Sequence, residues 1–213
     1  MPKHILLSIT YFGPIQYYSK WASGYPLLLE AHENYSKQTF RNRCVIASAN
    51  GRLNLTVPVV RETRVKVPIR EVRIDYSEMW QKNHLRALES AYRKSPFYNY
   101  YIDDLLPCFE QKPTYLFDLN LALSSTLNEL LKLHAKPQLT TTYEAGNNDM
   151  LDFRHAILPT KAIADPLFRT PVYPQNFEER WGFLENLSIL DLLFQTGPDA
   201  GYWLRESWNP SGT

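Results

Sequence analysis

The chain has 213 residues, enough for one domain with a sizeable core, and its 44% hydrophobic and 21% charged residues are ordinary globular composition. A formal net charge of +1 gives no case for nucleic acid or an anionic membrane as partner. The N-terminus lacks the features of a secretory signal, and no apolar run is long enough to span a bilayer. We therefore expect a cytoplasmic protein without membrane insertion, with its two cysteines reduced.

The N-terminal segment is predicted to alternate strand and helix. Residues 4–10 are typical of a buried strand, and the turn residues 11–14, which contain Gly-Pro, end it. The aromatic stretch 15–23 has helical spacing, and the apolar run 27–30 predicts a second short strand.

A β-hairpin is the clearest local signal. Asn50-Gly51 stands between two apolar runs, which predicts antiparallel strands over 44–49 and 53–59. Residues 69–75 are predicted as another strand because β-branched residues are flanked there by charge. They overlap the end of the longest basic stretch, 61–73. Its charges alternate with apolar residues, which is typical of a half-exposed strand or loop.

Helical patterns follow the hairpin. A helix is predicted over 77–94, before Pro96, and a second over 98–110. The third, 118–134, has a broad leucine face and stops before Pro137. Residues 138–143 are predicted as a strand.

The last third of the chain is less regular. Residues 144–160 are polar and contain Gly-Asn-Asn, which predicts a long surface loop. A helix over 188–195, closed by Gly197 and Pro198, fits a C-terminal stop pattern. The expected fold is one α/β domain, residues 1–213, with a mixed sheet, a central hairpin and three to four flanking helices.

Motifs for common chemistry are absent. The sequence has no Walker A loop, no G-x-G-x-x-G, no nucleophile elbow and no His/Cys spacing for zinc, so we expect no cofactor and no metal. Trp80 and His84 are four residues apart and share one face of the predicted helix. A histidine on an apolar face can act as a general base, and it can equally be a core histidine with its hydrogen bonds satisfied.

The segment before the hairpin combines cations with a thiol. Arg41 and Arg43 could clamp a carboxylate or a phosphate, such as the diphosphate of a nucleotide-sugar. Both would lower the pKa of Cys44 and make it a candidate nucleophile, or Cys44 is a small buried strand residue. Asp191, inside an apolar helix, is expected in an ion pair or on an outward face.

Three ordered blocks carry a resemblance to a known family. Residues 42–59 hold N-R, then N-G, then LTVPV; residues 80–97 hold W-x-K-x-H, then Y and SPF; residues 173–200 hold YPQ, then NLSILDLLF and GPDA. Together they resemble the WbqC-like family. Tyr11 and Pro14 are similar to its opening, although Ile9-Thr10 stands where the family usually has Gln-Pro. HENY at 32–35 replaces its D-x-x-Q-Y.

The resemblance implies work in surface-polysaccharide biosynthesis, because the family's members occur near O-antigen genes. It implies an enzyme that transfers an acyl or aminoacyl group to a nucleotide-linked amino sugar, with a nucleotide-sugar as the small-molecule partner. The candidate residues are His84 as catalytic base and, for substrate binding, Arg43, Asn42, Trp80, Arg41 and Tyr11. Two alternatives stay open: a non-catalytic binding or scaffold protein of the same pathway, and a thiol hydrolase or transferase that uses Cys44 with His84 or His155.

Overall fold

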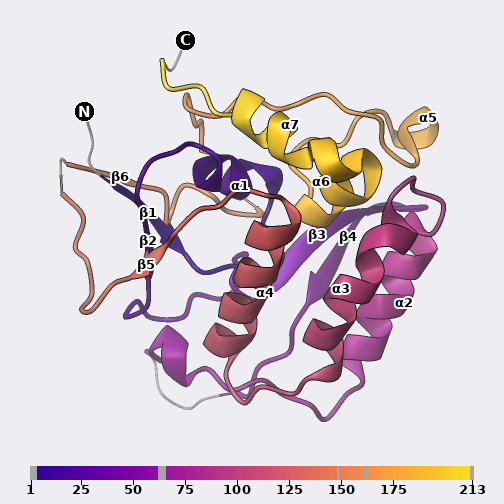
Figure 1. The fold of residues 1–213 in the computed structure, drawn as a ribbon. Coiled ribbons are helices and arrows are strands. Elements are labelled where there is room, and N and C mark those ends of the chain that lie inside the picture. The colour runs from indigo at the N-terminus through magenta and orange to yellow at the C-terminus, as the bar shows by residue number, and fades with distance from the viewer. Residues whose placement is uncertain (1–3, 62–65, 148, 161–162, 212–213) are drawn as a thin grey trace.

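The computed structural model describes residues 4–61, 66–147, 149–160 and 163–211 (Figure 1). Its α/β class is as predicted: strands in two sheets are surrounded by helices. The predicted mixture of parallel and antiparallel strands is present, with the antiparallel pairing in the hairpin. None of the helices in these ranges is long and apolar enough to cross a membrane.

A parallel sheet of four strands contains the N-terminal strand in its interior. Its members are β1 (His4–Ser8), β2 (Leu27–Glu30), β5 (Gln138–Leu139) and β6 (Met150–Asp152). The spatial order is β5-β2-β1-β6, and every neighbouring pair is parallel. The chain therefore runs from β1 outward to one side through β2 and β5, and then returns to the other side of β1 with β6. The order of the sheet reverses between β1 and β6.

The predicted hairpin is confirmed, as β3 (Arg43–Ser48) and β4 (Gly51–Thr56). Ser48 pairs with Gly51, so Ala49 and Asn50 form the turn. Gly51 has φ +91°, a left-handed backbone that glycine adopts without steric cost. The turn consequently lies one residue earlier than the Asn-Gly pair suggested.

Helices pack around both sheets, with α2 and α3 beside the hairpin and α6 and α7 above it in Figure 1. The helices of eight or more residues in the described part of the chain are α2 (Trp80–Tyr92), α3 (Tyr98–Glu110), α4 (Leu116–Leu130) and α6 (Ile189–Thr196). The shorter ones are α1 (Ile15–Trp21), α5 (Glu178–Trp181), α7 (Ala200–Glu206) and the single turns η1 (Ile69–Glu71) and η2 (Gly197–Asp199).

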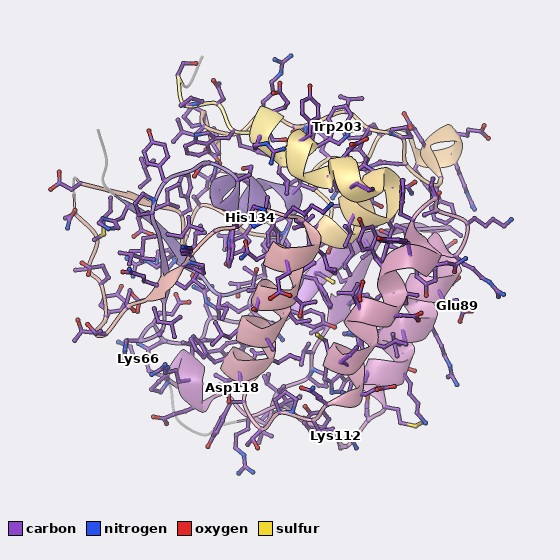
Figure 2. The ribbon with its side chains drawn as sticks, in the orientation of Figure 1. Lys66, Glu89, Lys112, Asp118, His134 and Trp203 are labelled. Carbon is purple, nitrogen blue, oxygen red and sulfur yellow. The ribbon has the colours of Figure 1, made fainter. Side chains whose placement is uncertain are left out.

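Helix ends differ from the predicted ones by a few residues. The bounds of α3 are those predicted, and α6 begins after Ser188, whose hydroxyl accepts a hydrogen bond from the Leu190 N–H. The end of α4 comes earlier than predicted, so His134 is exposed beyond it (Figure 2). Gly197 ends α6 with φ +55°, where an added Cβ would lie 2.5 Å from the Phe97 ring. The predicted stop at Gly197 is therefore confirmed.

Two element predictions were wrong. Residues 69–75 do not form a strand: they contain η1 and the isolated bridges of Ile74 with Val59 and of Arg73 with Tyr115. The buried Ile69 and Val72 are three residues apart, which is the period of one helical turn. Residues 62–65, within the basic stretch, lie outside the described ranges.

The predicted surface loop 144–160 contains β6, which adds an edge strand to the parallel sheet. Three residues are too few to show strand alternation in sequence. In the predicted strand 138–143, only Gln138 and Leu139 pair as β5. Residue 148 is not among the described residues.

Candidate substrate-binding site at the edge of the parallel sheet

Polar residues lie where the parallel strands end. Ser8 ends β1, Glu30 ends β2 and Asp152 ends β6, while Thr140 directly follows β5. The carboxyl ends of parallel strands share one edge, and open α/β sheets bind ligands in the crevice outside that edge, at the point where strand order reverses. This rule directs attention to the gap between the ends of β1 and β6.

Glu30 joins the loops that leave three strands. One of its carboxylate oxygens accepts a hydrogen bond from the Thr140 hydroxyl at 2.8 Å, and the other accepts from Arg154 at 3.0 Å and from the Glu144 N–H at 2.9 Å. Arg154 also pairs with Asp152 at 2.6 Å. Arg154 and Glu30 are buried, so this network is preorganised at the strand ends.

A second buried network surrounds the end of β1. Arg41 donates from Nε to Glu33 at 2.8 Å and from Nη2 to the Ser8 hydroxyl at 2.7 Å. Ser8 in turn donates to Glu33 at 3.1 Å. A second bond from Arg41 to the same carboxylate makes the pair bidentate. The predicted anion-binding residue Arg41 is therefore already neutralised by Glu33.

A small inner cavity lies between these networks. Its volume is about 10 Å³, room for about one water molecule. It is lined by Leu7, Ser8, Thr10, Tyr17, Phe40, Arg41, Phe153, Arg154 and Ile157. These residues come from the end of β1 and the loop after it, from α1, from the segment before β3 and from the segment after β6, so the inner cavity lies near the point where the strand order reverses.

A larger outer hollow adjoins it, and Phe40 lines both spaces. The outer hollow has a volume of about 470 Å³, within the range of small-molecule sites. Its described lining is Gln16, Phe40, Val45, Arg52, Leu158, Pro159, Thr160, Ile163, Asp165, Phe168, Thr170, Glu185 and Asn186. Arg52 and Glu185 carry opposite charges and Lys20 neutralises Asp165, so amides, hydroxyls and aromatic rings determine the character of the lining. This lining suits the hydroxyl and amino groups of a sugar ring, and not the diphosphate of a nucleotide-sugar.

Helix α1 fixes one wall of the outer hollow. The Gln16 N–H donates to the Asn186 side chain at 2.9 Å, and the Gln16 side chain donates to Asp165 at 2.9 Å. Lys20, also on α1, lies 2.6 Å from the Asp165 carboxylate. Burial lowers the pKa of Lys20, while Asp165 opposes that shift. Asp165 is thus held in place by two side chains of one helix.

The predicted catalytic residue His84 lies in a different, aromatic environment. Its Nδ1 is 2.8 Å from the Tyr11 hydroxyl, and its ring centroid is 5.2 Å from that of Trp80. Burial lowers the pKa of His84 to about 4, and a hydrogen bond to the Thr56 backbone opposes this only in part. The imidazole is therefore neutral at pH 7, with Nδ1 as acceptor for Tyr11. His84 lines neither the inner cavity nor the outer hollow.

Asn42 and Arg43 lie near the C-terminal end of β4, where His84 also bonds to the Thr56 backbone. The Asn42 side chain donates to the Val57 carbonyl at 2.9 Å, and Arg43 pairs with Thr56 across the hairpin. Three buried polar atoms of predicted site residues have no hydrogen-bond partner: Asn42 Oδ1, Arg43 Nε and Trp80 Nε1. Asn42, Arg43, Trp80 and His84 thus gather around Thr56 and Val57.

Two adjoining segments separate this cluster from the cavity. The Tyr11 N–H donates to the Phe40 carbonyl at 2.8 Å, which places residues 10–11 beside residues 40–43. Thr10, Phe40 and Arg41 line the inner cavity, whereas Tyr11 contacts His84. The structure therefore brings Arg41 to the inner cavity, while the other predicted site residues line neither the inner cavity nor the outer hollow.

Asp191 differs from its predicted environment. It is neither in an ion pair nor on an outward face: it is fully buried and accepts hydrogen bonds from Tyr92 at 2.8 Å, Tyr173 at 2.7 Å and Gln175 at 3.3 Å. Burial raises its pKa to about 6, against the lowering effect of these donors. Neutral hydroxyl and amide donors have satisfied a carboxylate for which a cation was expected.

Cys44 is fully buried in β3, and burial raises the pKa of its thiol. This is the environment of a packing residue and the opposite of what activates a nucleophile. Within the described ranges, no group of three or more His, Cys, Asp or Glu residues could hold a metal ion.

Sequence reasoning missed the residues that form the sheet-edge site. They are Ser8, Lys20, Glu30, Glu33, Asp152, Arg154 and Asp165. A signal existed for some of them: β1, β2 and β6 each end with a polar residue after apolar ones, in the sequences HILLS, LLLE and MLD. Lys20 and Asp165 had no such signal because their pairing joins positions 145 residues apart.

The fold and the candidate site define an α/β protein with a four-stranded parallel sheet, a separate hairpin, a small cavity at the carboxyl edge of the parallel sheet and a ligand-sized hollow that shares Phe40 with this cavity. The family model of the WbqC-like protein family matches residues 10–164, and the chain belongs to this family. An uncharacterized protein of Mycobacterium tuberculosis is 29% identical over 194 residues, which covers 80% of this chain and 84% of that protein. No solved structure matches the chain significantly.

Proposed function

We propose that this protein is an enzyme of surface-polysaccharide biosynthesis that acts in the cytoplasm and transfers an acyl or aminoacyl group to a nucleotide-linked amino sugar. The observation that supports it best is the outer hollow of about 470 Å³ beside the point where the strand order of the sheet reverses. Amide, hydroxyl and aromatic side chains line it, as the binding of a sugar ring requires.

One carboxylate of the hollow favours an amine as the acceptor group. Asp165 is neutralised by Lys20, whereas Glu185 is exposed in the described lining and can attract an ammonium group there. In the transfer, the ammonium first loses a proton, and the neutral amine nitrogen then attacks the carbonyl carbon of an activated acyl donor. The new C–N bond forms, the leaving group departs with the electron pair of its broken bond, and the nitrogen loses a second proton to a base.

A role for His84 as that base stays a prediction. A base must reach the substrate amine, and here the lone pair of Nδ1 is occupied by Tyr11. The contacts of His84 favour a positioning role, because Tyr11 belongs to the loop after β1 that also carries Thr10 of the inner cavity.

Binding and transfer are tested separately. Calorimetric titration with UDP-glucosamine should detect binding, and Glu185→Gln should weaken it about threefold, the effect of an exposed charge pair. UDP-N-acetylglucosamine, whose nitrogen is uncharged, should bind both forms equally. Glu110→Gln, an exposed residue at the end of α3, serves as the matched control.

Transfer is read as a mass gain on UDP-glucosamine after incubation with acyl thioester or aminoacyl ester donors. In cells, deletion of the gene should alter the surface polysaccharide, and wild-type protein should restore it. Failure to bind any UDP-linked amino sugar, together with an unaltered polysaccharide, contradicts the proposal. Binding without transfer under all donors supports instead a non-catalytic binding protein of the same pathway.

A further inference from the structure

The inner cavity contains two buried hydroxyl groups without well-formed hydrogen bonds. Thr10 is 5% exposed and Tyr17 is 1% exposed, and neither the Thr10 Oγ1 nor the Tyr17 hydroxyl makes a well-formed hydrogen bond. Thr10 and Trp21 are nevertheless close enough to the Tyr17 hydroxyl to oppose part of the rise in its pKa that burial causes. Thr10 and Tyr17 both line the cavity. A Cβ added at Gly13 would lie 2.5 Å from Thr10 Oγ1 and 3.1 Å from the Tyr17 ring, so the two side chains are neighbours. Buried polar groups are nearly always paired, and this exception needs an explanation.

The other polar groups around the cavity are already engaged. Ser8 and Arg41 bond to Glu33, and Arg154 bonds to Glu30 and Asp152. Two guanidinium groups against three carboxylates leave no positive charge to attract an anion. The Thr10 and Tyr17 hydroxyls lie close to each other without forming a well-formed hydrogen bond, so they are the lining groups that can still bond to a guest. They suit a neutral hydroxyl or an amine, because each of these can donate and accept.

The size of the cavity limits the guest to one substituent. About 10 Å³ holds a single oxygen or nitrogen atom with its hydrogens, and not a ring. Phe40 stands between the inner cavity and the outer hollow. Its carbonyl accepts from the Tyr11 N–H, and its side chain is buried. A ring in the hollow would therefore direct one substituent inward by displacing the Phe40 side chain.

We propose that the inner cavity is a specificity pocket for one hydroxyl or amino substituent of the sugar ring, recognised by Thr10 and Tyr17. This inference rests on the proposed function. It adds which part of the substrate the protein recognises, namely one substituent of the sugar ring. A sugar with a hydrogen in place of that substituent leaves both hydroxyls unpaired in the complex, and a site built to bond a hydroxyl discriminates against such an analogue.

The test compares UDP-glucosamine with its 3-deoxy, 4-deoxy and 6-deoxy analogues by calorimetric titration. Wild-type protein should bind one of the analogues at least about tenfold more weakly than the parent. Thr10→Val and Tyr17→Phe remove one hydroxyl each and nearly preserve shape. Each should reduce that ratio to near one while the thermal stability stays equal or rises, because an unpaired buried hydroxyl is removed.

Tyr18→Phe is the matched control. Tyr18 is on the same helix, is fully buried, has a hydroxyl without a well-formed hydrogen bond but near Ser124, and lines neither space. It should keep the wild-type ratio. Wild-type discrimination that survives in both Thr10→Val and Tyr17→Phe overturns the inference alone. A loss of stability in these variants, with no change in the ratio between the affinities for the parent sugar and the deoxy analogue, also overturns the inference. That result indicates that the cavity holds a structural water molecule. Absence of binding for every probe refutes the proposed function and this inference with it.

Discussion

Lys20→Met should destabilise the protein strongly, because it leaves a buried carboxylate unpaired. The Lys20 side chain has no solvent exposure, and its Nζ lies 2.6 Å from Asp165, whose side chain is 3% exposed. The ring centroids of Phe153 and Trp208 are 4.6 and 4.8 Å from the same nitrogen. Methionine keeps the unbranched apolar stem. It removes the ammonium group and with it the ion pair to Asp165 and the contacts with the two aromatic rings.

The magnitude follows from the burial of the pair. Removing one partner of a buried ion pair costs about 3–5 kcal/mol, since the remaining charge is left uncompensated. Lys20 itself is freed from a desolvation penalty that lowers its pKa, which favours the lower end of that range. For a chain of this length, we expect the melting temperature to fall by about 6–20 °C.

Urea denaturation followed by circular dichroism measures the change in the free energy of unfolding. Lys82→Met, at an exposed position on α2, should stay within about 0.5 kcal/mol of wild type. The double variant Lys20→Met with Asp165→Asn should be more stable than Lys20→Met alone, because no charge then remains buried and unpaired. A loss below about 1 kcal/mol for Lys20→Met, or a double variant no better than the single one, refutes the reasoning.

Further predictions concern titration, the Tyr11 contact and thiol reactivity. Burial raises the pKa of Asp191 from 3.8 to about 6, so its contribution to stability is full below pH 3.8 and is lost as pH rises through 6. Asp191→Asn should therefore remove a fall of about 3 kcal/mol between pH 4 and pH 7 in urea denaturation. Burial lowers the pKa of His84 from 6.5 to about 4, so its contribution is full above pH 6.5 and is lost as pH falls through 4. His84→Gln should remove this gain in stability with rising pH. If either variant keeps the wild-type dependence of stability on pH, the pKa shift assigned to that residue is contradicted. Tyr11→Phe leaves His84 Nδ1 without a donor and should cost about 1–3 kcal/mol, measured by thermal denaturation. Iodoacetamide at neutral pH should label the partly exposed Cys108 well before Cys44, and equal rates would show that Cys44 is accessible.

Local signals predicted much of the secondary structure. The hairpin, α3 and the capped start of α6 depend on neighbours within a few residues, namely Gly51, Pro96 and Ser188. The strand β6 has three residues and owes its conformation to pairing with β1, about 145 positions away. Its tertiary origin explains why the segment resembles a loop in sequence.

The site was predictable only in part, for a related reason. Asn42, Arg43, Trp80 and His84, chosen from their match to one family, lie near the end of β4, and their role as a site stays a prediction. The sheet-edge site depends instead on the order of the four strands, which no single segment reveals. Once that order is known, the polar residue at the end of each apolar strand indicates the site.

The tail of the chain connects the two spaces of the site. The inner cavity is lined by residues between 7 and 157, while the outer hollow also needs Asp165 to Asn186, beyond the match to the family model. The tail also fixes the loop after β1, because Asn186 bonds to the first turn of α1 and the Ser188 hydroxyl donates to the Phe12 carbonyl at 2.8 Å. That loop carries Thr10 of the inner cavity. Asn186 therefore lines the outer hollow and also anchors the first turn of α1, the helix that carries Tyr17 of the inner cavity, which couples the two spaces of the proposed site.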